Sequence, residues 1–169
     1  WFNQDEYFAC GPNYHIHQPD YLLINYCIGH VQAFHPAYRN MESQKTFVDW
    51  LNTVKTVDTT VKPTDFASRA LVGHYLQWVA METLRNLPYN IHVKLIPQSV
   101  IAVSDLDAQA TIQTHSGQWT VNSVLLTTGH CYHNGVLIDQ PNIPDVKYIR
   151  SPYPVSQFSE LFAQSSVGV

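Results

Sequence analysis

Residues 121–130 have the sequence Val-Asn-Ser-Val-Leu-Leu-Thr-Thr-Gly-His, and this stretch indicates the fold class more strongly than any other. Its Val and Leu residues do not alternate strictly with polar ones, a pattern typical of a strand covered on both faces in an α/β protein. The strand is expected to end at Thr128 and Gly129, at the sheet edge where α/β proteins bind ligands. Gly129 permits close approach of a ligand to the backbone, but a glycine that only lets the chain turn explains the same residues.

The composition is that of one globular domain with few charges. The chain has 169 residues, enough for a single hydrophobic core. Charged residues make up 13% of it, against a usual share of roughly 25%. Because the chain also has 10 Tyr, 7 Phe and 4 Trp, we expect some apolar surface to be covered by a ligand, a subunit or further polypeptide, and we expect association through such surface.

Charge and hydropathy argue against nucleic-acid and membrane partners, and the cysteine content indicates the redox compartment. A net charge of -4 argues against nucleic acid, which requires a basic face. The sequence has no basic amphipathic stretch and no apolar run of about 18 residues, so no membrane is expected. The odd number of cysteines, without a Cys-x-x-Cys pair, favours reduced thiols in a cytoplasmic protein.

Three segments are expected along the chain. Residues 1–65 are irregular with one helix near residues 46–51, and residues 131–169 are irregular with a short helix at 156–164. Residues 66–130 begin with a helix at 66–87, capped by Thr64 or Asp65. Its expected apolar arc consists of Val72, Leu76, Val79, Ala80, Thr83 and Leu87. Further strands are expected at 91–95, 99–103, 109–114 and 118–121, the last two joined by a hairpin at 115–117.

Three blocks of sequence resemble one known family. They are residues 11–30 with Pro19-Asp20-Tyr21-Leu22-Leu23-Ile24-Asn25 at their centre, Ser68 to Leu76, and the Thr127-Thr128-Gly129-His130 ending. In this order they are similar to segments of the FAD/NAD(P)-binding flavoproteins, relatives of flavin-dependent monooxygenases and pyridine-nucleotide oxidoreductases. The resemblance implies an α/β, partial doubly wound (Rossmann-like) FAD-binding domain, with a β-meander or hairpin insert around residues 92–121. It also implies an FAD-dependent oxidoreductase or monooxygenase that uses NAD(P)H.

The glycine turns of that family have no counterpart in the sequence. In such proteins one Gly-x-Gly-x-x-Gly turn at a helix N-terminus holds the FAD pyrophosphate, and a second turn holds NAD(P)H. None of the seven glycines has that spacing. The chain is therefore expected to be the piece between the two turns, inactive by itself, with residues 131–169 as a linker towards an NAD(P)H-binding part.

The resemblance also implies cofactor contacts at the flavin ring. Leu23 and Asn25 would approach the isoalloxazine, and Arg69 would face an anionic group or the flavin edge. From the residues alone, Asn25 could equally satisfy a turn, and Arg69 could be an exposed cation with a local acid. No catalytic acid or base is implied, because the flavin itself carries the redox chemistry.

Four further contacts are implied along the rest of the cofactor. Thr128 and Gly129 would lie against the FAD pyrophosphate or ribityl chain. Backbone groups of Ser99 and Val100 would face adenine.

A metal site would give the chain a different function. His15 and His17 would point to the same side of a strand, and His130, Cys131 and His133 add further nitrogen and sulfur ligands. Neither cluster has a recognised zinc spacing, and lone surface histidines explain both equally well, so we expect no metal.

The aromatic content is also compatible with a non-enzymatic interaction domain, which would use these residues to bind a protein partner. A hydrolase is weakly indicated by Ser151, His130 and Asp139. The sequence lacks the Gly-x-Ser-x-Gly turn that such a nucleophile requires.

Overall fold

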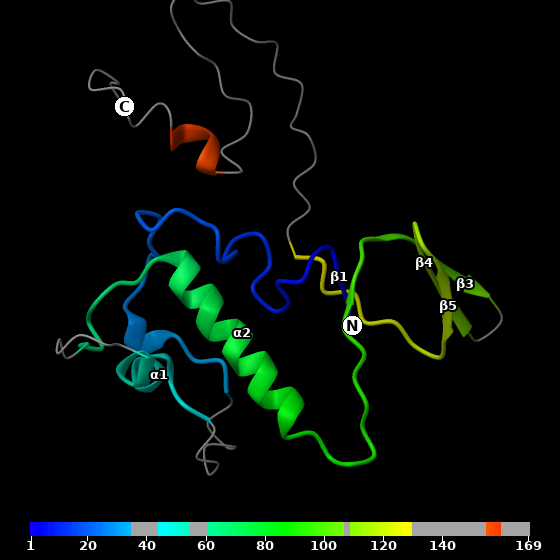
Figure 1. The fold of residues 1–169 in the computed structure, drawn as a ribbon, viewed down its shortest axis with the longest axis horizontal. Coiled ribbons are helices and arrows are strands. Elements are labelled where there is room, and N and C mark those ends of the chain that lie inside the picture. The colour runs from blue at the N-terminus through cyan, green and yellow to red at the C-terminus, as the bar shows by residue number, and fades with distance from the viewer. Residues whose placement is uncertain (35–43, 55–60, 107–108, 130–154, 160–169) are drawn as a thin grey trace, which may run out of the picture. The chain divides into compact units, whose positions relative to one another are not determined.

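The computed structural model describes residues 1–34, 44–54, 61–106, 109–129 and 155–159 (Figure 1). The chain divides into two compact units, Trp1–Leu125 and Leu126–Val169. Its helices are η1 (Ile28–His30), α1 (Phe47–Val54), α2 (Arg69–Arg85) and η3 (Val155–Phe158). Its strands are β1 (Phe2–Asn3), β2 (Ile96–Pro97), β3 (Val100–Leu106), β4 (Gln109–Thr114) and β5 (Gln118–Val121). The expected α/β class is thus confirmed in its coarse form, as helices with two small sheets.

Helix α1 forms where apolar residues recur at i, i+3 and i+4. The buried members of that pattern are Phe47, Trp50 and Leu51. Thr46 precedes the helix, and its hydroxyl accepts from the backbone N–H of Asp49 (3.2 Å), while the Asp49 carboxylate accepts from the backbone N–H of Thr46 (3.3 Å). This reciprocal pairing satisfies two N–H groups at the helix start. The helix predicted near residues 46–51 is therefore confirmed.

Helix α2 begins later than the sequence predicts. Its N-cap is Ser68, whose hydroxyl accepts from the backbone N–H of Leu71 (3.2 Å). The predicted caps, Thr64 and Asp65, are wrong. The Asp65 carboxylate instead accepts from the backbone N–H of Lys62 (2.8 Å) and closes a turn, which keeps this segment out of the helix.

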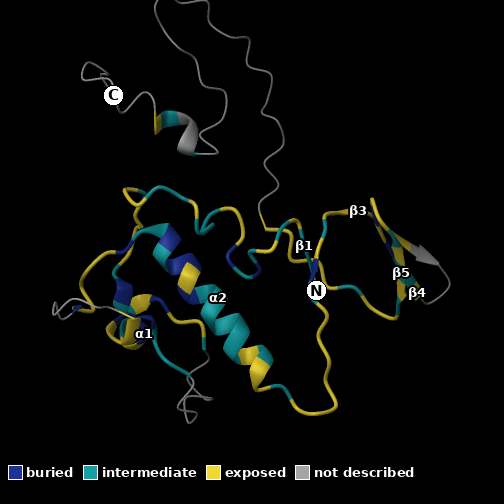
Figure 2. Cartoon of the chain, viewed as in Figure 1, coloured by how far each residue is buried: buried dark blue, intermediate teal, exposed yellow. Residues whose placement is uncertain are grey.

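Fully buried residues occur only in the first half of α2 (Figure 2). Its buried residues are Ala70, Val72, Gly73 and Tyr75. Leu76 and Val79 are partly buried against the same core, whereas Thr83 is exposed, so the predicted apolar arc extends too far towards the C-terminus. The core lies where α1 and the segment around η1 meet the first turns of α2, and the last turns extend beyond it.

A glycine allows α2 to approach the N-terminal segment closely. A Cβ atom built on Gly73 would lie 1.8 Å from the backbone oxygen of Tyr14 and 3.5 Å from the Cβ of Cys10. Only glycine fits at such a distance from a backbone atom. Gly73 therefore determines how residues 10–14 pack on the helix.

The N-terminus pairs with a short strand that sequence patterns did not predict. β1 and β2 are parallel, with Phe2 opposite Ile96 and Asn3 opposite Pro97. The N-terminal ammonium of Trp1 donates to the backbone oxygen of Lys94 (2.8 Å). The strand predicted at 91–95 is wrong: within the described ranges these residues pair with no strand, and most are exposed.

The hairpin prediction is confirmed. β3, β4 and β5 form an antiparallel sheet in that order, and β4 and β5 have the predicted bounds. The backbone N–H of Thr114 donates to the oxygen of Gly117 (2.9 Å) and closes the connection. Ile112, buried in β4, lies opposite Trp119 of β5, whose ring contacts that of Phe2 edge-on at 5.0 Å between centroids.

The strand predicted at the start of the stretch 121–130 is wrong beyond Val121, where β5 ends. Residues 122–129 form no strand, and Leu125 and Leu126 are 87% and 67% exposed. A strand requires hydrogen bonds to a neighbour, and the described residues provide none for this segment. The apolar pattern is present, but Leu125 and Leu126 stay largely exposed.

Most of the C-terminal unit lies outside the described residues. The helix predicted at 156–164 is seen as η3, and residues 160–164 fall outside the described ranges. The predicted linker 131–169 likewise falls almost wholly outside them. Among the residues that are described, none forms a helix with the length and apolar content needed to cross a bilayer.

Candidate functional site at the 22–29 and 63–69 pairing

Two segments far apart in sequence pair beside the start of α2. The backbone N–H of Ile24 donates to the oxygen of Ala67 (3.0 Å), and that of Arg69 donates to the oxygen of Leu22 (2.8 Å). These bonds flank an antiparallel bridge between Leu23 and Ser68. The two bridged residues thus form a non-hydrogen-bonded pair, whose side chains lie close together on one face.

The pairing is interrupted by a bulge. The next hydrogen bond joins the N–H of Ile28 to the oxygen of Asp65 (2.9 Å), so residues 25–27 lie opposite Phe66 alone. Extra residues on one side bend a strand and redirect its side chains. Asn25 and Tyr26 lie in this bulge, and both are exposed.

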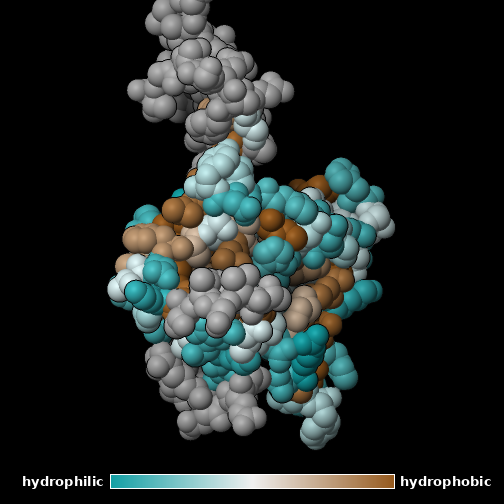
Figure 3. Space-filling view, turned by 60° about the vertical axis from the view of Figure 1, so that its left-hand side comes forward, coloured by the Kyte–Doolittle hydropathy of each residue, from teal (hydrophilic) through white to brown (hydrophobic). Residues whose placement is uncertain are grey.

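The two faces of the pairing differ in burial. On one face Ile24 and Ala67 belong to the core and are 3% and 6% exposed. On the other, Leu23 is 50% and Phe66 55% exposed. We call the exposed side chains of Leu23, Asn25 and Phe66 the Leu23 face. Figure 3, which brings the left-hand side of Figure 1 forward, shows hydrophobic patches among hydrophilic surface.

The structure brings three of the seven predicted contacts to this place. Leu23 and Asn25 lie on one segment of the pairing, and Arg69 is the first residue of α2. Sequence reasoning missed Phe66, because the helical pattern includes it. The signal that could have found it is the turn at residues 62–65, which leaves residues 66–68 to precede the helix in extended form.

The N-terminus of α2 has few free donors. The N–H of Arg69 donates to Leu22, that of Leu71 to the Ser68 hydroxyl, and that of Val72 to the Ser68 carbonyl (3.2 Å). A phosphate cradle needs several unpaired N–H groups at a helix start. This terminus therefore does not fit a pyrophosphate. The Arg69 side chain is half-buried, and no carboxylate among the described residues forms an ion pair with it.

The other four predicted contacts do not belong to this pairing. Ser99 is exposed and directly precedes β3, whose first residue, Val100, pairs with Thr114. Thr128 and Gly129 belong to the second unit and are exposed. All seven residues stay predictions as cofactor contacts.

Gly129 has the conformation expected of a turn glycine. Its φ is +67°, and a Cβ placed on it would meet nothing within 4 Å. Gly11 is its match elsewhere in the chain, with φ +57° and equally open space. The backbone strain of a side chain should therefore be similar at both positions, roughly 1–2 kcal/mol.

A comparison of substitutions at Gly129 and Gly11 therefore tests whether Gly129 contacts the cofactor. If Gly129 contacts a bound flavin, Gly129→Val should lower the flavin content of the protein, because its side chain would occupy space needed by the cofactor. Gly11→Val should leave the content unchanged. The ratio of flavin to protein absorbance measures both. Equal flavin content in the two variants would remove Gly129 from the site.

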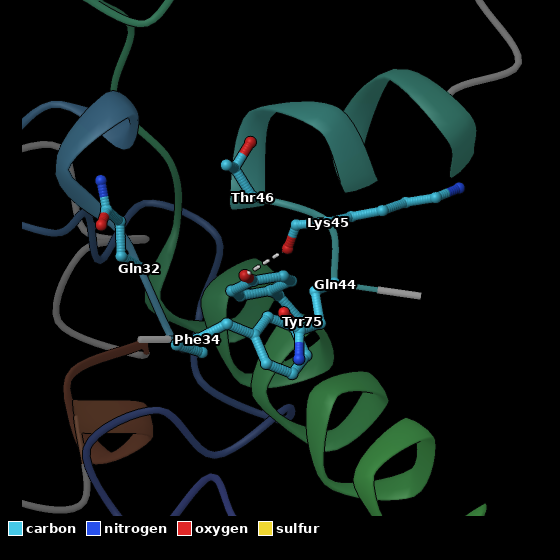
Figure 4. A pocket seen from close by; sticks show the side chains of 7 residues that line it. Gln32, Phe34, Gln44, Lys45, Thr46 and Tyr75 are labelled. Carbon is cyan, nitrogen blue, oxygen red and sulfur yellow. Dashed lines mark hydrogen bonds between the residues drawn. The ribbon is translucent and has the colours of Figure 1, made fainter. Parts of the chain in front are cut away.

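A small pocket beside Tyr75 is not a cofactor site. Its cavity volume is about 10 Å³, far below the roughly 300–1,000 Å³ of ligand pockets (Figure 4). The Tyr75 hydroxyl donates to the backbone oxygen of Lys45 (2.8 Å). Burial raises the pKa of Tyr75 to about 12, so this phenol stays protonated at neutral pH and its role is structural.

The histidine pair also has structural partners. Nε2 of His15 lies 3.5 Å from the Asp5 carboxylate, and Nε2 of His17 lies 3.0 Å from the Tyr7 hydroxyl. The described part of the chain contains no cluster of three metal-binding side chains. His130, Cys131 and His133 lie outside it, as do the hydrolase candidates Ser151 and Asp139.

Comparison with known proteins identifies the class. The model of the FAD-NAD(P)-binding family matches residues 2–131, which is most of the chain, so the chain belongs to this family. Membership indicates a domain that binds a flavin, a pyridine nucleotide or both.

One curated relative is nitrosuccinic acid synthase npaA of Aspergillus oryzae (strain ATCC 42149 / RIB 40). It is 30% identical over 71 residues, which cover 40% of this chain. The chain spans 11% of that protein's length.

Proposed function

We propose that this chain is part of the FAD-binding domain of a flavin-dependent, NAD(P)H-using oxidoreductase or monooxygenase. The observation that carries the proposal is the Leu23 face, inside the region that the family model matches. An exposed amide near exposed apolar residues in the same pairing suits a planar heterocycle, which needs apolar contact on its face and a hydrogen bond at its edge. The relative supports the reaction class, since the nitro group in the name of its product contains oxidised nitrogen.

The proposal assigns a position to each part of the cofactor. Leu23 and Asn25 face the isoalloxazine, and Arg69 lies near its polar edge. Ser99 and Val100 offer backbone groups to adenine. When bound, the flavin supplies the redox chemistry, while these residues bind and orient it and keep water from the ring.

The pyrophosphate needs groups that the start of α2 does not offer. The N–H groups there are largely paired, so in this proposal Thr128 and Gly129 approach the phosphates or ribityl chain, together with a glycine turn outside this sequence. The proposed fold of the whole domain is the doubly wound one that the family resemblance implies.

The same exposed apolar surface favours association. β3 is an edge strand with exposed Val100, Ile101 and Val103, and unpaired apolar edges bind other chains. We propose that further polypeptide of the same protein covers these residues. The segments 1–65, 66–130 and 131–169 remain our proposed division of the domain.

Asn25 provides the test of this function. Its side chain is exposed, so its amide is accessible to a ligand. In the full-length, flavin-loaded protein, Asn25→Ala should shift the flavin absorbance maximum or redox potential with little change in Tm. The matched control is Asn52→Ala, an exposed amide on α1.

A purely structural Asn25 would give the opposite result. If Asn25 only stabilises the bulge, the flavin spectrum stays unchanged and Tm falls by a few degrees, as expected for a lost hydrogen bond of about 1 kcal/mol.

A further inference from the structure

We infer that Phe66 contacts the ring of the bound flavin directly and forms the apolar wall of its site together with Leu23. This inference rests on the proposed function and adds a residue that the sequence patterns did not single out. It follows from the exposure of Phe66, from the rigidity of its backbone and from its place opposite the bulge.

The exposure of Phe66 is imposed by its backbone. The carbonyl oxygens of both neighbours are engaged, Asp65 by Ile28 (2.9 Å) and Ala67 by Ile24 (3.0 Å). Because Ala67 points into the core, the alternation of an extended segment directs Phe66 the other way. A phenylalanine fixed in this position stays exposed unless another group covers it.

Because Phe66 is exposed, the protein lacks the stabilisation that burial of this side chain would provide. Burial of a phenylalanine side chain is among the larger stabilising contributions that a single residue can make. The same short segment buries Ala67 and leaves the larger ring outside. A rigid aromatic side chain held in solvent is typical of a binding surface.

The neighbours of Phe66 determine which ligand fits. The bulge opposite it carries Asn25, and Leu23 lies on the same face of the pairing. Two apolar side chains and one amide, without a charged residue among them, match a planar, uncharged ring with polar atoms at its edge. The isoalloxazine of a flavin has that chemistry, and it is the part of FAD that needs no phosphate cradle.

The inference is tested with three variants of the full-length protein. Phe66→Ala should raise the Kd for FAD about 3- to 10-fold, the range that corresponds to a lost aromatic stacking contact. Phe66→Tyr should retain the wild-type Kd, because it preserves the ring. Tyr89→Ala removes an exposed aromatic residue in the turn after α2 and should change nothing. Kd is measured by titrating FAD into protein stripped of flavin, and Tm is recorded for each variant.

The outcomes separate this inference from the proposed function. An unchanged Kd for Phe66→Ala, with a shifted flavin spectrum for Asn25→Ala, would overturn the role of Phe66 and leave the function in place. Loss of FAD together with a drop in Tm that Phe66→Tyr does not rescue would make Phe66 structural and also overturn the inference. If neither Phe66→Ala nor Asn25→Ala affects the flavin, the function itself is wrong.

Discussion

Replacing Gly73 with alanine should lower the stability of the first unit by about 3 kcal/mol, at the upper end of what overpacking costs. The new Cβ would lie 1.8 Å from the Tyr14 backbone oxygen, so the helix or the segment 10–14 has to move. Without that clash the same change would stabilise α2, since alanine is favoured over glycine in a helix by about 1 kcal/mol. A fall in stability would therefore indicate the close contact between Gly73 and the Tyr14 backbone, and a rise would indicate that this contact is absent.

Thermal unfolding followed by far-ultraviolet circular dichroism measures it. For a domain of this size, about 3 kcal/mol corresponds to a fall in Tm of roughly 6–12 °C. His74→Ala, at an exposed position next in the same helix, is the matched control and should leave Tm nearly unchanged. A Gly73→Ala protein as stable as the wild type would show that α2 and residues 10–14 do not pack as described.

Purified alone, these 169 residues should retain no FAD and should have no oxidoreductase activity. FAD affinity in this family depends on a glycine turn at a helix N-terminus, and the sequence has no Gly-x-Gly-x-x-Gly. The start of α2 cannot substitute, because its N–H groups are largely paired. The chain should also self-associate, since Leu125, Leu126 and the edge of β3 are uncovered.

Size-exclusion chromatography with an absorbance spectrum of the peak tests both statements. The expected result is a colourless sample that elutes as oligomers, and the control is the longer polypeptide that the proposed function requires, expected to be yellow. A yellow, monomeric peak from the 169 residues alone would mean that they already contain a complete cofactor site.

Local patterns in the sequence predict local structure well. The spacing of Phe47, Trp50 and Leu51 predicts α1, and the turn residues 115–117 predict the β4–β5 hairpin, because both depend on neighbours in sequence. The start of α2 differs from its prediction because distant residues decide it. Pairing of residues 24 and 28 with the carbonyl groups of 67 and 65 holds this segment extended against its helical pattern.

The same difference between local and long-range determinants explains how much of the candidate site could be predicted from the sequence. The resemblance is sufficient to single out Leu23 and Asn25, and the structure places both as exposed residues on the segment that pairs with residues 65–69. The bulge at residues 25–27, and with it the position of Phe66, depends on a register that no sequence pattern reveals. The strand expected at 121–126 requires a neighbouring strand, so its apolar pattern alone could not form it.

The proposed cofactor site is tested most directly by determining where the flavin ring lies relative to Asn25. A crystal structure of the full-length protein with its flavin should show the isoalloxazine against Leu23 and Phe66, with a ring nitrogen or oxygen about 3 Å from the Asn25 amide. A flavin whose ring lies against different residues, with the Leu23 face still exposed to solvent or covered by polypeptide, would contradict this assignment.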